Sequence, residues 1–156
     1  MRVRPYRDGD APALAALFHA AVHGIARLHY SQAQVDAWAP GVPDAERFRS
    51  RSTDGRVLLV AVDESDAPLA YGDVESDGHI DHLFCRPDAA GTGVAATLYA
   101  VIEQTARERG VSRLYTEASE PARRFFLKHG FAETARNDFD LAGVPIHNFR
   151  MEKALS

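Results

Sequence analysis

The pattern of apolar and polar residues in the first part of the chain predicts a short strand followed by helices. Apolar residues recur every three or four positions from Leu14 to Ala21, which is the spacing of one face of an α-helix. Asp8 or Asp10 is expected to cap this helix, because a carboxylate just before a helix accepts hydrogen bonds from its first amides. A strand over residues 3–6 precedes it, and a capping-box pattern at Ser31 begins a second helix.

The middle of the chain changes to the pattern of strands. Residues 57–62 are all apolar, which is typical of a buried strand. A second strand is expected over residues 69–75 and, after a turn at residues 77–78, a third over residues 79–85. Consecutive strands joined by short turns predict an antiparallel meander.

The rest of the chain alternates helices and strands. A long helix over residues 94–109 follows a glycine-rich loop, and Gly110 fits the residue that ends it. Expected after it are a strand over residues 114–117, a helix over 120–129 and two strands near 131–140 and 146–153. This order predicts an α/β (α+β) fold, with a mixed, mostly antiparallel sheet flanked by helices, in a single domain over residues 1–156.

Composition and charge narrow the class of protein further. The 156 residues are 46% hydrophobic and 26% charged, which suffices for one domain with a buried core. A formal net charge of −4 argues against nucleic-acid binding through a basic surface. No apolar run suggests a membrane span or a secretory signal, and the single cysteine, Cys85, excludes an internal disulfide. We therefore expect a cytoplasmic protein that binds neither nucleic acid nor membrane.

The sharpest local feature is the glycine-rich loop before the long helix. Glycines allow a tight turn and the close approach of a ligand, while the first turn of a helix offers unpaired amides. Such a loop binds phosphate groups without basic side chains. Its residues are Gly91, Thr92, Gly93, Val94, Ala95 and Ala96.

Several interpretations of this loop compete. An ordinary glycine turn is one of them. A dinucleotide-binding fingerprint fits poorly, because the preceding strand belongs to a meander and Ala96 stands where the third glycine should be. A Walker loop is excluded, because the sequence Gly-Lys-Ser/Thr is absent. A site for the pyrophosphate of coenzyme A remains.

Four segments, in order along nearly the whole chain, resemble the GNAT superfamily of N-acetyltransferases. Residues 3–10 resemble its first strand and helix cap, and residues 79–109 match its acetyl-CoA motif in order and spacing. Residues 118–131 resemble its block ending in a Gly-Phe pair, and residues 150–153 its closing strand. The resemblance implies a GNAT-like fold and direct transfer of an acetyl group from acetyl-CoA, as co-substrate, to an amine of a small molecule or peptide. It is also compatible with a homodimer.

The resemblance also implies where the coenzyme binds. The loop at residues 91–96 would hold the pyrophosphate through its backbone amides. A backbone N–H in the strand before it, at Leu83, Phe84 or Cys85, would polarise the thioester carbonyl.

The chain departs from the family pattern at three of these positions. Ala90 stands where many members carry Gln or Arg, and Ser119 stands where Asn is frequent. Phe126 replaces a frequent Tyr that is often proposed to protonate the leaving thiolate. Ser119 and Phe126 remain expected coenzyme contacts, and a similar subgroup carries both together with a segment like residues 30–40.

The acceptor side needs a group that takes a proton, because an alkylamine is mostly protonated at neutral pH. The family commonly recruits this base from the two strands before the loop, so Glu75 and Asp81 are the expected candidates and His82 a reserve. Strand alternation puts Asp81 and His82 on opposite faces unless a bulge changes the parity. Alternatively, each of these three side chains has no catalytic role and lies on a solvent-exposed face of the sheet. By resemblance, Tyr30 and Trp38 wall the acceptor site.

Two other functions stay open. A coenzyme A-binding module with weak or no catalysis is favoured by the missing tyrosine at Phe126. Transfer of a longer acyl group also fits, because the loop contacts the pyrophosphate and not the acyl chain. His19 and His23 share a helix face but lack a third ligand, so no metal site is expected. Cys85 has no legible histidine partner, which favours direct transfer over an acyl-enzyme.

Overall fold

The computed structural model describes residues 1–155. Strands and helices follow one another in the order that the apolar pattern predicts, with single 3₁₀ turns at Asp8–Asp10, Ala26–Leu28 and Pro87–Ala89. The elements are β1 (Arg2–Pro5), α1 (Ala11–Gly24), α2 (Gln32–Trp38), α3 (Ala45–Arg51), β2 (Val57–Val62), β3 (Pro68–Val74), β4 (Leu83–Cys85), α4 (Val94–Glu108), β5 (Arg113–Ala118), α5 (Glu120–Lys128), β6 (Ala132–Leu141) and β7 (Val144–Ala154).

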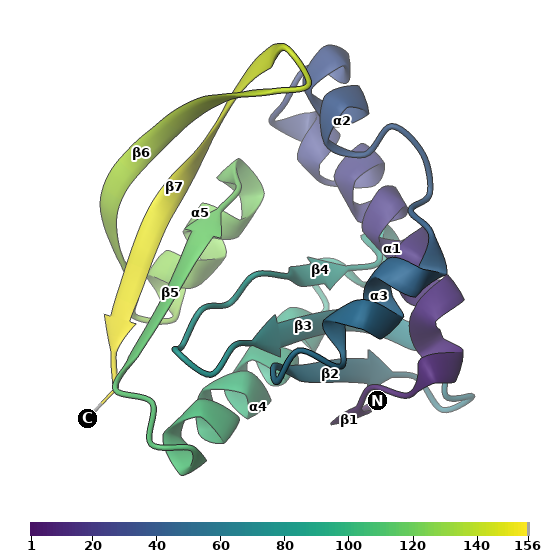
Figure 1. Ribbon diagram of the computed structural model, residues 1–156, viewed down its shortest axis with the longest axis vertical. Helices are drawn as coiled ribbons and strands as arrows, with labels where there is room; N and C mark the ends of the chain where they lie inside the picture. Colours follow the sequence, from purple (N-terminus) through teal and green to yellow (C-terminus); the bar gives the residue numbers. More distant parts are fainter. Residues whose placement is uncertain (156) are drawn as a thin grey trace.

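The strands form two antiparallel sheets that diverge from each other. One sheet has the order β1-β2-β3-β4 and the other the order β5-β7-β6. They meet at a single parallel bridge between His79 and Tyr115, where the N–H of Ile80 also donates to the carbonyl of Tyr115 at 2.8 Å. Beyond this point the sheets spread apart, as Figure 1 shows. The predicted mixed α/β fold is confirmed, with the difference that the strands divide into two sheets.

Helices cover both faces of the first sheet. The apolar face of α1 packs with Phe48 of α3 against Leu58, Val60 and Tyr71 on one side. Leu98 and Ile102 of α4 pack against the opposite side, in a core that also takes in α5 and the second sheet. The strands β2 and β3 are therefore buried on both faces, which explains the unbroken apolar run that marks β2.

The third predicted strand is shorter than expected. Only residues 83–85 form β4. Residues 79–82 depart from regular strand pairing and reach β5, although the carbonyls of His79 and His82 still accept from the N–H groups of Glu75 and Asp73. The cause is Asp73, whose buried Oδ1 accepts hydrogen bonds from the backbone N–H groups of Asp81, at 2.9 Å, and His82, at 3.0 Å. A side chain thus replaces main-chain partners of β3. Asp81 and His82, expected on opposite faces, both turn toward the Asp73 side of the strand.

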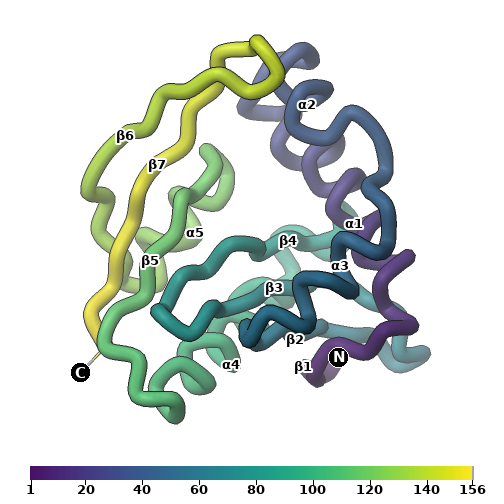
Figure 2. The backbone as a smooth tube through the Cα atoms, viewed as in Figure 1, coloured from purple at the N-terminus to yellow at the C-terminus, as the bar shows by residue number. Residues whose placement is uncertain are grey.

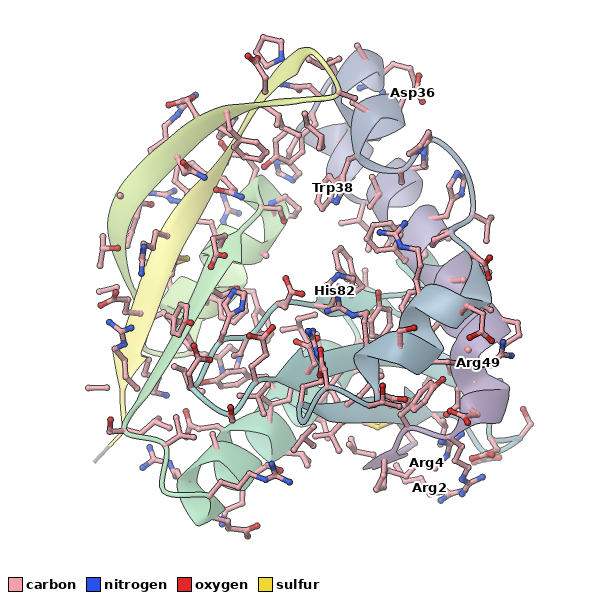
Figure 3. The ribbon with its side chains drawn as sticks, in the orientation of Figure 1. Arg2, Arg4, Asp36, Trp38, Arg49 and His82 are labelled. Carbon is pink, nitrogen blue, oxygen red and sulfur yellow. The ribbon has the colours of Figure 1, made fainter. Side chains whose placement is uncertain are left out.

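The predicted helix starts are confirmed at Ser31 and corrected at Asp10. Ser31 and Gln34 form both hydrogen bonds of the capping box. Asp10 occupies the N-cap position of α1, but its carboxylate accepts hydrogen bonds from the buried Arg4 and the N–H of Arg7 instead of capping the helix. Figure 3 shows Arg4 at the start of the chain. The helix α1 therefore begins without a side-chain cap, and Asp10 ties β1 to it.

The helical stretch from Asp8 to Leu28 is long and apolar enough to cross a membrane by length and composition, with a mean hydropathy of 1.3. Core helices share this composition. Leu14, Leu17 and Val22 are buried inside the protein, against the first sheet and the segment before α2. The sequence pattern did not single out this stretch as a possible span.

The hairpin formed by β6 and β7 reaches from the second sheet across to α2. Figure 2 shows its turn beside the α2 region. Ile146 packs in one cluster with Val35 of α2, and the Gln34 side chain donates to the carbonyl of Pro145 at 3.0 Å. The two halves of the molecule are thus joined at the His79–Tyr115 bridge and again at the hairpin, with an opening between these points.

Candidate active site

A cavity of about 910 Å³ fills the opening between the two sheets. One wall comes from α1, α2 and α3, the floor from residues 81–84, and the other wall from β5, α5 and the β6–β7 hairpin. Figure 3 shows His82 and Trp38 both directed into this space from different elements. Among the residues expected to act in a site, the cavity is lined by Tyr30, Trp38, Asp81, His82, Leu83, Phe84, Ser119 and Phe126.

The floor of the cavity exposes backbone N–H groups. The strand β4 is the edge of its sheet, and its antiparallel register pairs Leu83 with Gly72, Phe84 with Tyr71 and Cys85 with Ala70. The N–H of Arg86 donates to Leu69 and that of Asp73 to His82, so alternation makes Phe84 and Tyr71 the hydrogen-bonded pair. The N–H groups of Leu83 and Cys85 then point away from β3, toward the diverging sheet. They can donate to an oxygen placed in the opening.

The glycine-rich loop ends at the start of α4, as the sequence predicts. Gly91 and Gly93 have φ angles of 75° and 90°, a region that favours glycine, and a Cβ at either would point into open space. The first intrahelical hydrogen bond runs from the N–H of Thr97 to Gly93. The amides of Val94, Ala95 and Ala96 thus lie in the unpaired first turn at the positive end of a helix of 15 residues. This geometry fits an anionic phosphate group.

The remaining expected coenzyme contacts differ in exposure. Ser119 occupies the N-cap position of α5, and its hydroxyl makes no capping hydrogen bond. Phe126 lines the cavity but is only 2% exposed, because Tyr99, Phe125 and Phe131 surround its ring. Cys85 does not line the cavity, and burial raises the pKa of its thiol.

Glu75 and Asp81, the expected bases, are both bound to arginines. Glu75 pairs with Arg56 at 3.1 Å and does not line the cavity. Asp81 lines it, but Arg51 and Arg56 approach its Oδ2 to 2.7 and 3.3 Å. Burial alone would raise the pKa of Asp81, but the hydrogen bond and charge of Arg51 outweigh it and hold that pKa below its usual value. A carboxylate held in this way is a weak proton acceptor.

His82 stands at the centre of the cavity floor, among aromatic rings. Phe18 stacks on its imidazole at a centroid distance of 5.6 Å, and Phe84 approaches edge-on at 5.2 Å. Burial and the nearby Arg51 lower the pKa of His82 to about 4, so the ring is neutral at neutral pH. Its Nδ1 lies 2.9 Å from the hydroxyl of Tyr71.

The two aromatic residues expected in the acceptor wall have different environments. Trp38 is half-buried and contacts Phe84 and Tyr30 edge-on. Tyr30 is 3% exposed, and burial raises the pKa of its hydroxyl. That hydroxyl donates to the carbonyl of His147 at 2.8 Å and accepts from the N–H of Glu120 at 3.0 Å. Tyr30 thereby joins the first turn of α5 to β7.

The structure adds a pair of side chains that the sequence did not indicate. His147 of β7 lines the cavity, and its Nε2 lies 2.6 Å from Oε1 of Glu120 at the start of α5. The two residues are 27 positions apart, and although Glu120 lies in the segment 118–131 that resembles the family, nothing in the sequence pairs it with His147. Asp73 is a second such residue, and here the sequence carries a signal, because an aspartate inside a buried strand indicates a buried ion pair.

The other histidines of α1 have structural partners. The rings of His19 and His23 stack at 4.3 Å, and Nε2 of His23 lies 2.7 Å from the carbonyl of Ala39. Within residues 1–155 no group of three or more His, Cys, Asp or Glu side chains is arranged to hold a metal ion.

Comparisons with known proteins agree with this architecture. Residues 26–153 match the family model described as an acetyltransferase (GNAT) domain. A GCN5-related N-acetyltransferase from Rhodopseudomonas palustris has a similar structure, with a TM-score of 0.89 and 33% identity, covering 99% of this chain and 95% of that one. The uncharacterized N-acetyltransferase YafP of Escherichia coli K12 is 28% identical over 151 residues, which are 97% of this chain and 94% of YafP. The structure of YncA, a putative acetyltransferase from Salmonella typhimurium with acetyl-CoA, has a TM-score of 0.75 at 20% identity, covering 100% of this chain and 94% of that one.

The diverging sheets, the exposed amides of β4 and the loop at α4 together define an acyltransferase. The chain belongs to the GNAT family of acetyltransferases. The family, fold class and enzyme class expected from the sequence are confirmed.

Proposed function

We propose that this enzyme transfers the acetyl group of acetyl-CoA to an amine of a small molecule or peptide by direct attack. The observation that supports this most strongly is the position of the outward N–H group of Leu83, in the floor of a cavity that both sheets line, with the outward N–H of Cys85 next along the same edge strand. Acetyl-CoA supplies the activated acetyl group as its thioester. YncA, which has the same fold, was solved with acetyl-CoA.

The residues of this chain fit that co-substrate. The amides at residues 93–96 would hold the pyrophosphate, since Gly91 and Gly93 adopt positive φ angles and have no side chain to obstruct it. An N–H of Leu83 or Cys85 would donate to the thioester oxygen, as an oxyanion-type donor. Ser119 and Phe126 would contact the coenzyme beside α5.

Direct attack is favoured over an acyl-enzyme by the state of Cys85. A thiol whose pKa is raised by burial forms little of the reactive thiolate. Its Sγ lies 3.4 Å from the carbonyl of Arg86 and outside the cavity lining. The acceptor amine would therefore meet the thioester within the cavity, between Trp38, Tyr30 and His82.

His82 serves this reaction better as a donor than as a base. Tyr71 is fully buried, and within residues 1–155 its hydroxyl has no hydrogen-bond partner other than Nδ1 of His82. A buried hydroxyl that donates no hydrogen bond costs free energy, so the Tyr71 hydroxyl donates to Nδ1 of His82. Because Nδ1 then accepts, the proton of the neutral imidazole resides on Nε2. Nε2 itself is not buried, and it can donate to a carbonyl or carboxylate oxygen of the acceptor.

Turnover with a panel of amines tests the proposal. Free thiol release is measured with acetyl-CoA and alkylamines, amino acids or lysine peptides, and the acetylated amine is identified by mass spectrometry. Acetyl-CoA binding without release of thiol for any amine would indicate a coenzyme A-binding module instead. Faster release from longer acyl-CoA thioesters would indicate a different acyl donor.

A further inference from the structure

The geometry points to His147 as the group that takes the proton from the acceptor amine, with Glu120 as the residue that positions its imidazole. This inference rests on the proposed function and assigns a role to two residues outside the expected site. His147 comes from β7 and lines the cavity, and Glu120, in the first turn of α5, binds it from outside the cavity lining.

The hydrogen bond between the two side chains fixes which ring nitrogen is free. A carboxylate only accepts, so Nε2–H of His147 donates to Oε1 of Glu120 at 2.6 Å. The neutral ring then carries its lone pair on Nδ1. Within the described part of the chain, Nδ1 has no hydrogen-bond partner, and it is not among the buried nitrogen and oxygen atoms that lack one. It is therefore partly exposed, on a residue that lines both this cavity and a smaller pocket of about 360 Å³ beside β6.

The exposed ring nitrogens of His147 and His82 have opposite hydrogen-bonding roles. The Tyr71 hydroxyl makes the reachable nitrogen of His82 a donor, whereas the Glu120 carboxylate makes the reachable nitrogen of His147 an acceptor. Asp81 is held by two arginines, and Glu75 lies outside the cavity lining. Among the candidates, His147 is thus the one that lines the cavity and has a ring nitrogen with a free lone pair.

The surroundings of the imidazole keep its position fixed. The Tyr30 ring lies 5.4 Å from it, and the Tyr30 hydroxyl holds both the His147 carbonyl and the Glu120 N–H. Phe149 meets it edge-on at 5.5 Å. The charged groups nearby are Glu120 on α5 and, on β6, Asp138, which faces His147 in the strand register, with Arg136 beside it.

The proton and electron changes balance without any further reactant. Nδ1 of His147 takes a proton from the acceptor ammonium, and the released nitrogen lone pair forms the C–N bond with the thioester carbon as the C–S bond breaks. The attacking nitrogen still carries one proton more than the amide product; that proton goes to the departing thiolate, which leaves as the free thiol. The imidazolium, stabilised by the Glu120 carboxylate, releases its own proton to solvent.

The kinetic test compares His147→Gln with wild type on an acceptor identified from the amine panel. We expect kcat/KM to fall about 10²-fold at neutral pH and less as the pH rises toward the pKa of the amine. A fluorinated, less basic analogue of the same acceptor, already neutral at pH 7, should lose much less. His29→Gln, which changes an exposed histidine outside the cavity lining, is the matched control. An equal loss at every pH and for both amines, or no loss, would overturn the role while wild-type turnover upholds the proposed function.

A second measurement is made on the free protein, without acetyl-CoA or an acceptor amine. Imidazole ¹⁵N spectra of the free protein should show His147 with its proton on Nε2, and Glu120→Gln should mix the two tautomers. Wild-type spectra with the proton on Nδ1 would contradict the assignment, even if His147→Gln failed to fold. If no amine is acetylated by wild type, the proposed function fails and the role of His147 fails with it.

Discussion

The hydroxyl of Tyr71 lies 2.9 Å from Nδ1 of His82, and this contact decides what the imidazole offers to the cavity. Tyr71 is fully buried on β3, and within residues 1–155 its hydroxyl has no other partner than that nitrogen, to which it therefore donates. The ring is surrounded by Phe18, Phe48 and Phe84, which disfavour its charged form. A histidine in the expected place for a base is thereby converted into a neutral donor.

The low pKa of His82 predicts a specific pH dependence of stability. An imidazole of the unfolded chain has a pKa of about 6.5, whereas that of His82 is about 4 in the folded protein. Between these values the unfolded chain binds the extra proton, so the free energy of unfolding falls as the pH decreases from about 6.5 to about 4. His82→Gln should remove on the order of 1–3 kcal/mol of that decline. The measurement is urea unfolding of both proteins at several pH values.

The exposed His29 provides the control for this experiment. His29→Gln should follow the wild-type curve at every pH. If the His82→Gln curve also runs parallel to wild type from pH 7 to pH 4, the imidazole is not held neutral by the fold.

The phosphate loop can be tested with a pair of glycines that share the same backbone strain. Gly93 has a φ angle of 90° and Gly55, between α3 and β2, has 94°, and a Cβ at either meets nothing within 4 Å. Alanine should therefore cost similar stability, roughly 1 kcal/mol, at both positions. Only Gly93→Ala should weaken acetyl-CoA binding, about tenfold or more, because its methyl group would crowd the phosphate. Calorimetric titration measures both dissociation constants, and equal affinities would remove the loop from the site.

Tyr30→Phe tests the connection between α5 and β7. Its hydroxyl satisfies the His147 carbonyl and the Glu120 N–H, and both groups lose a partner in the variant. We expect a loss of about 1–3 kcal/mol in the free energy of unfolding, measured by chemical denaturation. Tyr115→Phe removes a more exposed hydroxyl, bonded to Asp77, and should cost less than about 1 kcal/mol. Similar losses in the two variants would mean that the Tyr30 hydroxyl does not stabilise the connection between α5 and β7.

Local sequence patterns predicted the elements well where local physics decides them. The capping box at Ser31, the buried run of β2 and the glycine-rich start of α4 are each set by residues close together in the chain. The length of β4 and the orientation of Asp81 and His82 were not predictable in this way, because a carboxylate on another strand, that of Asp73, takes their amides. Tertiary partners override strand alternation there.

The candidate site shows the same division. The coenzyme loop and the edge strand before it follow from sequence order and family resemblance. The pair of His147 and Glu120 joins two elements that are adjacent only after β7 inserts between β5 and β6. Similarly, two arginines form ion pairs with Asp81: Arg51 from α3 and Arg56 from the loop after it. Which carboxylates remain free for chemistry is a property of the fold and not of any local motif.

The ion pairs of Asp73 should stabilise the protein far more than a surface ion pair does. Asp73 is fully buried, receives Arg51 and Arg56 at 2.8 Å each, and also holds the amides of Asp81 and His82. Asp73→Asn removes the charge and takes from Arg56, whose side chain is only 9% exposed, its buried partner, leaving it the more exposed carboxylates of Asp54, Glu75 and Asp81. Removing one partner of a buried pair costs about 3–5 kcal/mol, so we expect a loss of that order in urea unfolding. Asp88→Asn breaks an exposed pair with Arg86 of the same 2.8 Å length and should cost less than about 1 kcal/mol.

Because Asp73 also holds the backbone at His82, Asp73→Asn should perturb the imidazole signals of His82 in NMR spectra, whereas Asp88→Asn should leave them unchanged. Equal and small losses in the two variants would show that the Asp73 carboxylate does not shape the floor of the cavity.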